Sequence, residues 1–425
     1  MNRKIRVAWI CDFSNEKIRE KITIHIGIVR NLIWKFKKNQ CQALQTDKGV
    51  WNTNAFREFE KRDDVELHVI APCPLLKQRK QDFILDGIHY YFYRDESTNL
   101  LRTLYRQIIK PKYYHYRSNR RIVKGLIKRI APDVVHLIGA ENPHYSLCLL
   151  DIQKSVPTIV QLQTLMNDPN FFGNYPIDEQ SYRYRSSVEK SVILRADYIG
   201  TRAKKFISII RDSIKPDIRL INTTLAVGED IQEEQVKKQF DFVYFASNIN
   251  KAGDLALEAF GKAFQIHPNI SMDIIGGYDN EFKHALDIII KKYDIGDAVT
   301  FEGRLKTHDD VLEQIRKSRY ALLPLRIDLI SGCIREAMSN GLPVITTDTG
   351  ELGTQMLNKD YECALISSKD DTDALAKNML ILLNDANVAD RLRNNGLKRQ
   401  LERYDNSRVV DEYIDAYKKC LTEKR

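Results

Sequence analysis

The sequence lacks long apolar runs, paired cysteines and a glycine-rich loop after its first strand-like segment. No run approaches the roughly 18 apolar residues that a transmembrane helix needs, and the start MNRKIRVAWIC leads into a strand-like run without a signal peptide. The seven cysteines are scattered and include no Cys-x-x-Cys pair, which favours reduced thiols over disulfides or a zinc site. We therefore expect a cytoplasmic protein.

The missing glycines argue against one class of enzyme. NAD- and FAD-dependent oxidoreductases carry Gly-x-Gly-x-x-Gly after the first strand, because only glycine lets the backbone approach a pyrophosphate closely. Here that segment reads WICDFSNEKIRE. The sequence also has no Asp-x-Asp at a strand end and no His/Cys cluster with metal-ligand spacing, so we expect neither a metal nor a cofactor.

Charge divides the chain into two unlike halves within a net charge of +9. Residues 1–224 carry 39 Lys and Arg against 23 Asp and Glu, whereas residues 225–425 carry 27 against 34. A basic half beside an acidic half suggests that the first half faces something anionic. Nucleic acid, a membrane surface and a phosphorylated acceptor are the candidates.

Strand-like and helix-like segments alternate in both halves. The first half has strand-like IRVAWIC, VELHVIA, IHYYFY, VVHLIG, TIVQLQ, YIG and IRLIN, with helical patterns at 115–130, 144–154 and 179–195. The second half has DFVYFAS, SMDIIG, AVTFEG, YALLPL, LPVITT and ECALI, with helices near 254–266, 279–293, 308–317 and 372–384. The pattern predicts an α/β fold of two doubly wound Rossmann-like domains, 1–224 and 240–405, with a polar linker at 225–239 and an amphipathic helix at 406–425.

One segment of the second half, residues 328–348, predicts a loop, a short helix and a strand. Ser331 can cap the helix and leave the amides of Gly332 and Cys333 free, and Asn340-Gly341 can end it. In a parallel sheet such a loop opens at the carboxyl end of its strand, where helix amides attract an anion such as a diphosphate.

Glu336 stands four residues after Gly332, so both lie on one face of this helix. The carboxylate is then one turn below the anion site, where it can accept hydrogen bonds from sugar hydroxyls but would repel a phosphate. The plainer alternative is that Glu336 is an early-helix acid favoured by the helix dipole.

The whole run resembles the signature of retaining GT-B glycosyltransferases of family 4, in which an acidic pair eight residues apart grips the nucleotide-sugar donor. The residues that carry the resemblance are Pro324, Asp328, Glu336-Ala337-Met338 and Gly341-Leu342-Pro343-Val344-Ile345. Asp328 stands where the family usually has Glu, and Ser-Gly-Cys replaces a Gly-Phe-Gly-like turn. The resemblance implies a GT-B fold with two domains facing a cleft and a last helix that crosses back to the N-terminal domain. It also assigns Asp328 and Glu336 to the catalytic site.

Further donor-side residues follow from the same resemblance. Lys251 takes the role of a diphosphate-binding cation, with a solvated side chain as the alternative. The family's accompanying Arg is missing, which leaves one cation unless Arg304, Arg326 or Arg335 takes its place. The implied donor-binding residues are Ser247, Gly276, Gly277, Arg304, Leu305, Ser331, Gly332 and Cys333. The Gly-Gly pair could equally be a tight connection.

The acceptor side is expected in the first domain. The segment 12–15 either shapes an acceptor pocket or forms a capping turn before a helix at 15–22. His136 lies within an apolar run and is expected in the core, and no catalytic base is assigned. The candidate acceptor-side residues are Asp12, Ser14, Asn15, Glu141, Asn142 and His144.

We predict a retaining glycosyltransferase that moves a sugar from a nucleotide-sugar donor to a glycan or lipid-linked acceptor in surface-polysaccharide assembly, without a metal. Retaining transfer in this family is described as a front-face attack, which needs no protein nucleophile. The alternatives are a GT-B nucleotide-sugar epimerase or hydrolase, and a non-catalytic GT-B binding partner.

The most basic stretch, residues 102–129, holds ten cationic residues and no acidic one, with tyrosines interleaved. It matches no nucleic-acid module, so we expect no nucleic-acid partner. An anionic membrane surface fits better, because cationic residues and tyrosines suit the lipid interface. This hypothesis makes the protein peripheral on the inner membrane face, and the alternative is a solvated basic helix.

Overall fold

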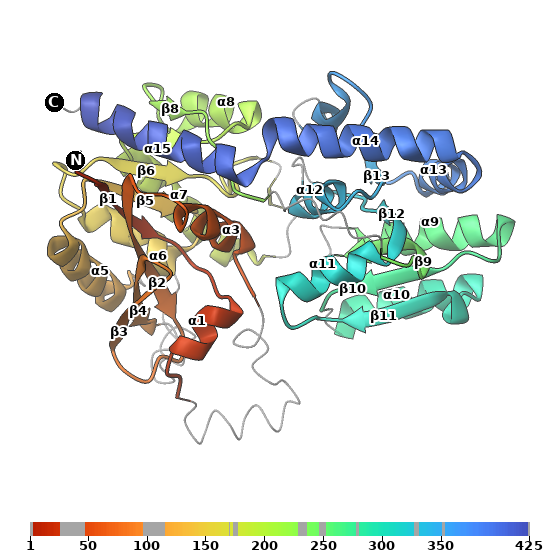
Figure 1. The fold of residues 1–425 in the computed structure, drawn as a ribbon, viewed down its shortest axis with the longest axis horizontal. Coiled ribbons are helices and arrows are strands. Elements are labelled where there is room, and N and C mark those ends of the chain that lie inside the picture. Colours follow the sequence, from red (N-terminus) through yellow and green to blue (C-terminus); the bar gives the residue numbers. More distant parts are fainter. Residues whose placement is uncertain are drawn as a thin grey trace. The chain divides into compact units, whose positions relative to one another are not determined.

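The computed structural model describes residues 3–25, 47–96, 115–169, 171–172, 177–227, 236–245, 252–277, 280–326, 331–350 and 353–423. The chain forms two compact units. Unit 1 consists of Met1–Gly173, Ile177–Ala226 and Asn406–Arg425, and unit 2 of Asn174–Pro176 and Val227–Asp405. Each is a Rossmann-like α/β layer structure, as the alternating pattern predicts (Figure 1).

The sheet of unit 1 has the strand order β3-β4-β2-β1-β5-β6-β7-β8 and is parallel except for the β3–β4 pair. Most residues of its central strands are buried, as in strands that are covered on both faces. The strands are β1 (Ile5–Ile10), β2 (Val65–Cys73), β3 (Lys80–Leu85), β4 (Ile88–Arg94), β5 (Val134–Ile138), β6 (Thr158–Gln161), β7 (Tyr198–Gly200) and β8 (Leu220–Ile221).

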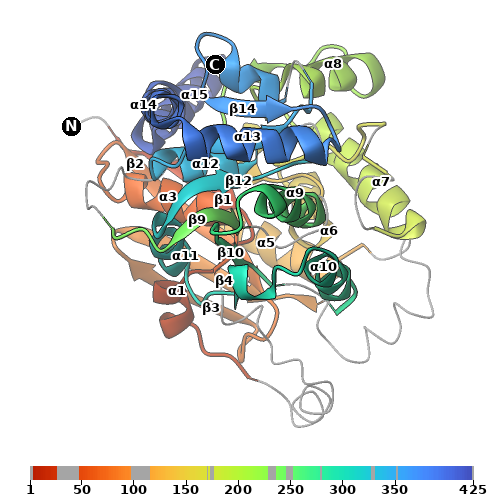
Figure 2. The ribbon, with the colours of Figure 1, turned by 90° about the vertical axis from the view of Figure 1, so that its right-hand side faces the viewer.

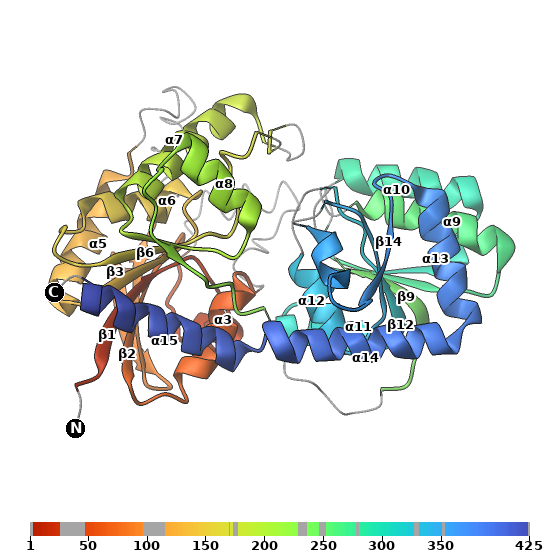
Figure 3. The same cartoon turned by 90° about the horizontal axis from the view of Figure 1, so that it is seen from above.

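Helices cover both faces of this sheet. In Figure 3, α5, α6 and α7 lie on one side of it, and α15, which contacts α3, lies on the other. The helices of unit 1 are α1 (Glu16–Lys21), α3 (Val50–Phe59), α5 (Arg117–Ile130), α6 (Pro143–Ser146), α7 (Glu179–Arg195), α8 (Lys204–Ser213) and α15 (Asn406–Glu423), with a 3₁₀ turn at Leu147–Asp151.

The last helix, α15, belongs to unit 1 although it follows unit 2 in the sequence. Its apolar stripe is buried, and Tyr417 Oη accepts a hydrogen bond of 2.8 Å from Trp9 Nε1 and lies 2.8 Å from His136 Nδ1. His136 is 1% exposed, and burial lowers its pKa to about 3. The expected core histidine and the expected crossing of the last helix are both confirmed.

The sheet of unit 2 is parallel throughout, with the order β11-β10-β9-β12-β13-β14. In such a sheet the carboxyl ends of all strands meet at one edge, which is where loops carry ligand sites. The strands are β9 (Phe240–Phe245), β10 (Met272–Ile275), β11 (Val299–Gly303), β12 (Ser318–Leu322), β13 (Val344–Thr347) and β14 (Ala364–Ser367).

Two helix layers enclose the sheet of unit 2. One contains α9, α10 and α13, with α9 against both of the others, and the second contains α11, α12 and α14 (Figures 2 and 3). The bounds are α9 (Gly253–Ile266), α10 (Asn280–Tyr293), α11 (His308–Arg316), α12 (Gly332–Ser339), α13 (Thr372–Asn384) and α14 (Ala386–Arg403), with 3₁₀ turns at Gly296–Ala298 and Thr354–Asn358.

The sequence analysis did not find β3, α3, α8 or α14. The strand β3 is an edge strand whose residues alternate between exposed and half-buried, and the first half of its sequence KQDFIL is polar. Within the described part of the chain, no helix is long and apolar enough to cross a membrane. The six cysteines that the structure describes are all free thiols, as expected.

Candidate active site

Helix α12 begins at the carboxyl edge of the unit 2 sheet, between β12 and β13. Ser331 caps it, because its hydroxyl accepts a hydrogen bond of 3.3 Å from the amide of Cys333. The expectation that both first-turn amides stay free is therefore wrong for Cys333, since an N-cap hydroxyl satisfies the second or third amide of its helix. The amide of Gly332 precedes this bond and remains the better candidate for an anion.

Glu336 is half-buried on the same helix face as Gly332, as predicted. A Cβ atom placed on Gly332 would lie 3.7 Å from Oε1 of Glu336, so the carboxylate turns back toward the start of the helix. The helix ends as expected, because Gly341 adopts a left-handed φ of 68° after the C-cap residue Asn340.

The Gly-Gly pair follows β10 at the same edge. The amide of Gly276 donates to the carbonyl of Gly303 over 2.8 Å, which ties the ends of β10 and β11 together. Arg304 then lies across the backbone, because a Cβ atom on Gly277 would be 3.3 Å from its Cδ. Arg304 is exposed, whereas its neighbour Leu305 packs partly buried against the core. Gly277 thus provides the space that the arginine stem occupies.

Arg326 follows β12 and is held by carboxylates. It forms two hydrogen bonds to Asp254, of 2.7 and 2.6 Å, and its Nε lies 3.8 Å from Asp370. Asp254 stands in the first turn of α9. A paired guanidinium of this kind neutralises its partners and offers less net charge to a diphosphate.

The other two candidate arginines differ in exposure. Arg335 is buried, with its guanidinium carbon 5.1 Å from the centre of the Tyr404 ring. Arg304 is exposed and has no ion pair within the described residues. Of the three arginines proposed to replace the missing one, Arg304 therefore has the charge that is easiest to redirect toward a ligand.

Three of the predicted donor-side residues lie outside the described residues. They are Ser247, Lys251 and Asp328. Their roles therefore stay predictions.

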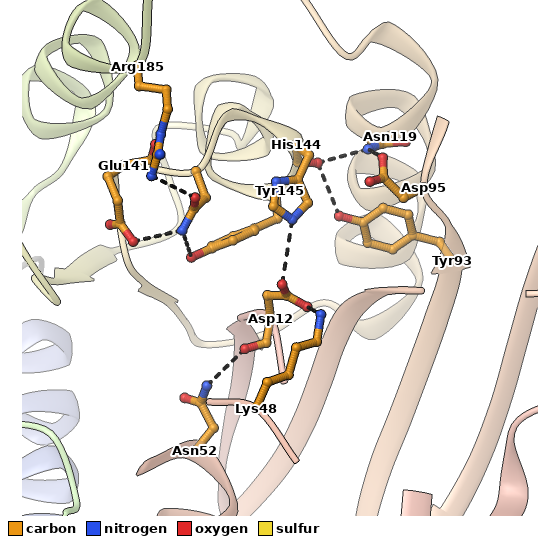
Figure 4. Close-up of polar contacts among 11 residues, drawn as sticks. Asp12, Lys48, Asn52, Tyr93, Asp95, Asn119, Glu141, His144, Tyr145 and Arg185 are labelled. Atoms are coloured by element: carbon orange, nitrogen blue, oxygen red, sulfur yellow. Dashed lines mark hydrogen bonds and ion pairs between the residues drawn. The ribbon is translucent and has the colours of Figure 1, made fainter. Parts of the chain in front are cut away.

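Asp12 is the centre of a polar group at the carboxyl end of β1 in unit 1 (Figure 4). Its Oδ1 accepts a hydrogen bond of 2.7 Å from Lys48 Nζ, and its Oδ2 lies 3.7 Å from His144 Nε2. Burial alone would raise the pKa of Asp12, but the contacts with His144 and Lys48 outweigh it and lower this pKa. Gly49 permits the approach of this loop, since a Cβ there would lie 2.6 Å from the Asp12 carbonyl oxygen.

The residues after Asp12 have structural contacts. Phe13 is buried in the core of unit 1. Asn15 caps α1, with its Oδ1 accepting 2.9 Å from the amide of Ile18, and Ser14 Oγ accepts 3.3 Å from Arg19. The capping turn considered for this segment is therefore present, and Asp12 is the residue of the segment that contacts the loop bearing His144.

Glu141 is a buried carboxylate in the loop between β5 and α6, 4% exposed. Its Oε1 accepts 2.7 Å from Asn142 Nδ2 and 3.1 Å from the amide of Gln163, which in turn accepts 3.0 Å from Trp51 Nε1. Its Oε2 has no hydrogen-bond partner within the described residues, and burial raises the pKa of Glu141. Arg185 holds the loop by bonds to the Glu141 carbonyl, 2.9 Å, and to Asn142 Oδ1, 3.0 Å.

The family comparison covers the donor-side unit. Residues 228–399 match the family described as glycosyl transferases group 1. The match covers less than half of the chain. No curated protein matches the chain significantly by sequence. The loop and helix that carry Glu336 lie inside the matched range.

Solved structures extend the likeness to the whole chain. Sucrose-phosphate synthase from Thermosynechococcus elongatus superposes with a TM-score of 0.66 at 14% identity, over 99% of this chain and 100% of that one. HepE from Anabaena, in complex with UDP and glucose, gives 0.62 at 12% identity over 97% and 99%. The pneumococcal O-GlcNAc transferase GtfA, in complex with UDP and GlcNAc, gives 0.56 at 14% identity over 70% and 60%. The fold is GT-B and the protein is a glycosyltransferase.

Several residues of the candidate site were not found from the sequence. Lys48, Gln163 and Arg185 contact the predicted acceptor-side residues from loops and helices far away in the chain. A single lysine, glutamine or arginine has no distinctive spacing. The one local signal was Gly49, a glycine directly before an apolar helical pattern, and glycine before a helix has many ordinary explanations.

Proposed function

We propose that the protein is a retaining glycosyltransferase that moves a sugar from a nucleotide-sugar, with uridine diphosphate sugars as the first candidates, to a glycan or lipid-linked acceptor in surface-polysaccharide assembly. The observation that carries the proposal is the start of α12, where Glu336 turns back toward Gly332 within the range that matches the glycosyltransferase family. HepE and GtfA are both described with UDP, which supports the choice of donor.

On the donor side, the reaction needs positive charge where the diphosphate leaves. In this proposal the amide of Gly332, Lys251 and the exposed Arg304 supply it, while Glu336 accepts hydrogen bonds from donor hydroxyls. Asp328 contacts the sugar. The bond between the anomeric carbon and the diphosphate oxygen breaks, and the nucleoside diphosphate leaves with the bonding electron pair.

On the acceptor side, Asp12 and His144 would orient the attacking hydroxyl. Its oxygen bonds to the anomeric carbon on the face that the diphosphate leaves, and its proton passes to a diphosphate oxygen. Such a front-face transfer preserves the configuration of the sugar and requires no protein nucleophile. His144 and Lys48 lower the pKa of Asp12, which supports a role for this carboxylate as a hydrogen-bond acceptor.

The test is to incubate the protein with a panel of nucleotide-sugars and a membrane-lipid and oligosaccharide acceptor set, and to measure release of nucleoside diphosphate. NMR of the product then gives the anomeric configuration. We expect release that depends on an acceptor, a retained configuration, and the same rate in a chelator because the cations replace a metal. An inverted product would contradict the retaining mechanism, and a rate lost in chelator and restored by Mn²⁺ or Mg²⁺ would contradict metal independence.

Transfer to water is the second candidate, and one observation favours it. Glu141 is a buried carboxylate in the loop just before α6, which carries His144, and one of its oxygens has no hydrogen-bond partner among the described residues. Such a group could act as a base toward a small nucleophile. Sugar release at an equal rate with and without acceptors would support a hydrolase and contradict the transferase. A change in sugar configuration at another carbon would identify an epimerase.

We also propose that α5 binds an anionic membrane surface. Its exposed cationic residues are Arg117, Arg121, Lys124, Lys128 and Arg129, and the last of these is paired with Asp82 at 3.1 Å. Arg120 is instead paired with Asp151, by hydrogen bonds of 2.6 and 2.8 Å, so it has little charge to offer to lipid. Each free cation near anionic lipid contributes about 1 kcal/mol. Most of the remaining basic stretch, 102–114, lies outside the described residues.

The membrane proposal is tested with anionic and neutral vesicles at low salt. Reversal of charge at Arg121, Lys124 and Lys128 should release the protein from anionic vesicles, and nucleotide affinity should not change. A variant that reverses the exposed Lys190 and Lys291 and Lys377 changes the net charge equally and should still bind. Equal binding by both variants, or no binding by the unmodified protein, would contradict the proposal.

A further inference from the structure

Strand pairing in unit 1 brings together three metal-ligating side chains that the sequence keeps apart. Glu66 and His68 lie two residues apart on β2, and His68 is paired directly with His89 on β4. Side chains two apart on a strand share a face, so all three are on one face of the sheet. One ligand atom from each lies within 4.8 Å of the others.

We propose that Glu66, His68 and His89 bind a divalent transition-metal ion of the zinc class. Two imidazoles and a carboxylate form a donor set that suits Zn²⁺, which prefers nitrogen and oxygen ligands in a tetrahedral arrangement. A solvent molecule would complete the site, because Glu66 and His89 are only half-buried. The site is independent of the proposed transferase function.

The ligand atoms are spaced almost as closely as they are in an occupied metal site. In a tetrahedral zinc site, ligand atoms are about 3.4 Å apart. The His68 Nε2 and Glu66 Oε1 atoms are 3.0 Å apart. The rings of His68 and His89 stack with centres 4.6 Å apart and planes at 22°, and a ligand atom of each lies within 4.8 Å of the other. Closing the site needs a movement of the half-exposed His89 ring by roughly 1 to 1.5 Å.

His68 has a partner that fixes its ring in either tautomer. It is 5% exposed, so the residues packed around it hold the ring in place. Its Nδ1 lies 3.1 Å from the hydroxyl of Tyr91, which can both donate and accept. Without metal, Nε2 carries the proton and donates to Glu66. With metal, the proton moves to Nδ1 and is donated to Tyr91, as metal-bound histidines usually require of an outer partner.

The surrounding charges leave one carboxylate oxygen available. Arg6 donates to the Oε2 atom of Glu66 over 3.1 Å, while the metal would use Oε1. From α5, Arg129 stands 5.0 Å over the Tyr91 ring, and its charge is paired with Asp82 at 3.1 Å. These arginines reduce the affinity for a cation, and we therefore expect micromolar rather than tighter binding.

The position within the sheet indicates a stabilising ion. Glu66, His68 and His89 lie near the amino ends of parallel strands, whereas Asp12 follows the carboxyl end of β1. Each residue adds about 3.3 Å to the length of a strand. An ion bound near the amino ends would therefore lie several residues away from Asp12 at the opposite edge of the sheet. It would tie β2 to β4 and raise the melting temperature by binding the folded state alone.

The experiment is a Zn²⁺ titration of the untagged, chelator-treated full chain against a chromophoric competitor, followed by Co²⁺ absorption. We expect one equivalent to bind and to raise the melting temperature. His89→Ala and Glu66→Gln should each weaken binding by at least about tenfold, since loss of an outer partner alone costs 10- to 100-fold. The control is His267→Ala, an exposed histidine in unit 2, which should bind as the unmodified protein does.

Three results would overturn the proposal. They are the absence of stoichiometric Zn²⁺ and Co²⁺ binding, affinity unchanged in both site variants, and thiolate charge-transfer bands that place Co²⁺ on cysteines. Tyr91→Phe provides a check that does not remove a ligand. It should weaken Zn²⁺ binding while the metal-free melting temperature changes little, and unchanged affinity would remove Tyr91 from the site.

Discussion

The two sheets present ligand groups at their carboxyl edges in different ways. In unit 2 the described groups are mainly backbone amides and glycine turns, with the Glu336 carboxylate and the exposed Arg304 beside them, while Arg326 and Arg335 contact their own neighbours. In unit 1 they are side chains that contact one another from distant loops, as Asp12, Lys48 and His144 do. A diphosphate is shared by all nucleotide donors and can be bound by generic backbone features. An acceptor is particular to one enzyme and requires specific side chains.

The sharpest test of this comparison is Glu336→Ala on the donor side. Loss of a charged hydrogen bond costs about 1.5–3 kcal/mol, so we expect at least a tenfold loss of nucleotide affinity and a larger loss of transfer. Calorimetry with the nucleoside diphosphate and an assay of its release measure the two. Glu313→Ala, an exposed glutamate on α11, is the control. Unaltered nucleotide affinity in Glu336→Ala would contradict the assignment.

A second test concerns Lys251, the cation that is proposed to bind the diphosphate together with the amide of Gly332. Lys251→Ala should weaken a nucleoside diphosphate by about ten- to a hundredfold and a monophosphate far less, because its ammonium is assigned to the second phosphate. The control is Lys262→Ala, since Lys262 is paired with Asp373 at 2.7 Å. Isothermal titration with both nucleotides gives the answer, and equal weakening of the two would show that Lys251 does not distinguish them.

A substitution on the acceptor side should weaken binding of the acceptor and leave binding of the nucleotide unchanged. Asp12→Asn keeps the shape of the side chain but removes the charge that Lys48 and His144 contact, so we expect the KM for the acceptor to rise by about tenfold, from the loss of roughly 1.4 kcal/mol. Nucleotide affinity should not change. Asp63→Ala, at a side chain that is fully exposed, is the control. A loss of nucleotide affinity in Asp12→Asn would contradict the proposal that unit 1 binds the acceptor and unit 2 the nucleotide.

The smallest expected effect is on stability in unit 2. Burial raises the pKa of Asp273 from 3.8 to about 6, against the opposing hydrogen bond from Gln314. A raised pKa means that the stability from this group is complete below about pH 4 and is lost as the pH rises through 6. Melting temperatures of Asp273→Asn should therefore fall less than those of the unmodified protein between pH 4 and 6. The prediction would be contradicted if the melting temperatures of Asp273→Asn and of the unmodified protein fell equally between pH 4 and 6. It would also be contradicted if substitution of the exposed Asp297 by Asn changed the pH dependence as much.

The sequence predicts features that are determined within one short segment better than features that depend on contacts between distant segments. The helix α12 has its cap at Ser331 and its stop at Gly341 within its own segment, and both are confirmed. The stripe of α15 could be predicted from periodicity, and its docking on unit 1 from the family resemblance. In contrast, the pairing of His68 with His89 depends on strand register. Register follows from packing and turns, so no spacing in the sequence reveals it.

The same reasoning explains the incomplete prediction of the site. The contact of Lys48 with Asp12 requires a loop held close by Gly49, and the bonds from Arg185 to the Glu141 loop come from a helix in another part of unit 1. These contacts join residues more than 30 positions apart. A single sequence indicates which residue types are present there but not which of them meet.

The place of α15 in unit 1 has a consequence for how the protein is made. The ribosome synthesises residues 1–226 first, yet the helix that covers Trp9 and His136 begins only at Asn406. At about 5–20 residues per second, the nascent first unit waits roughly 10 to 40 seconds with this aromatic surface uncovered. Unit 2, whose sequence is continuous from Val227 to Asp405, can fold during that interval. The second unit to be synthesised is therefore expected to be the first to finish folding.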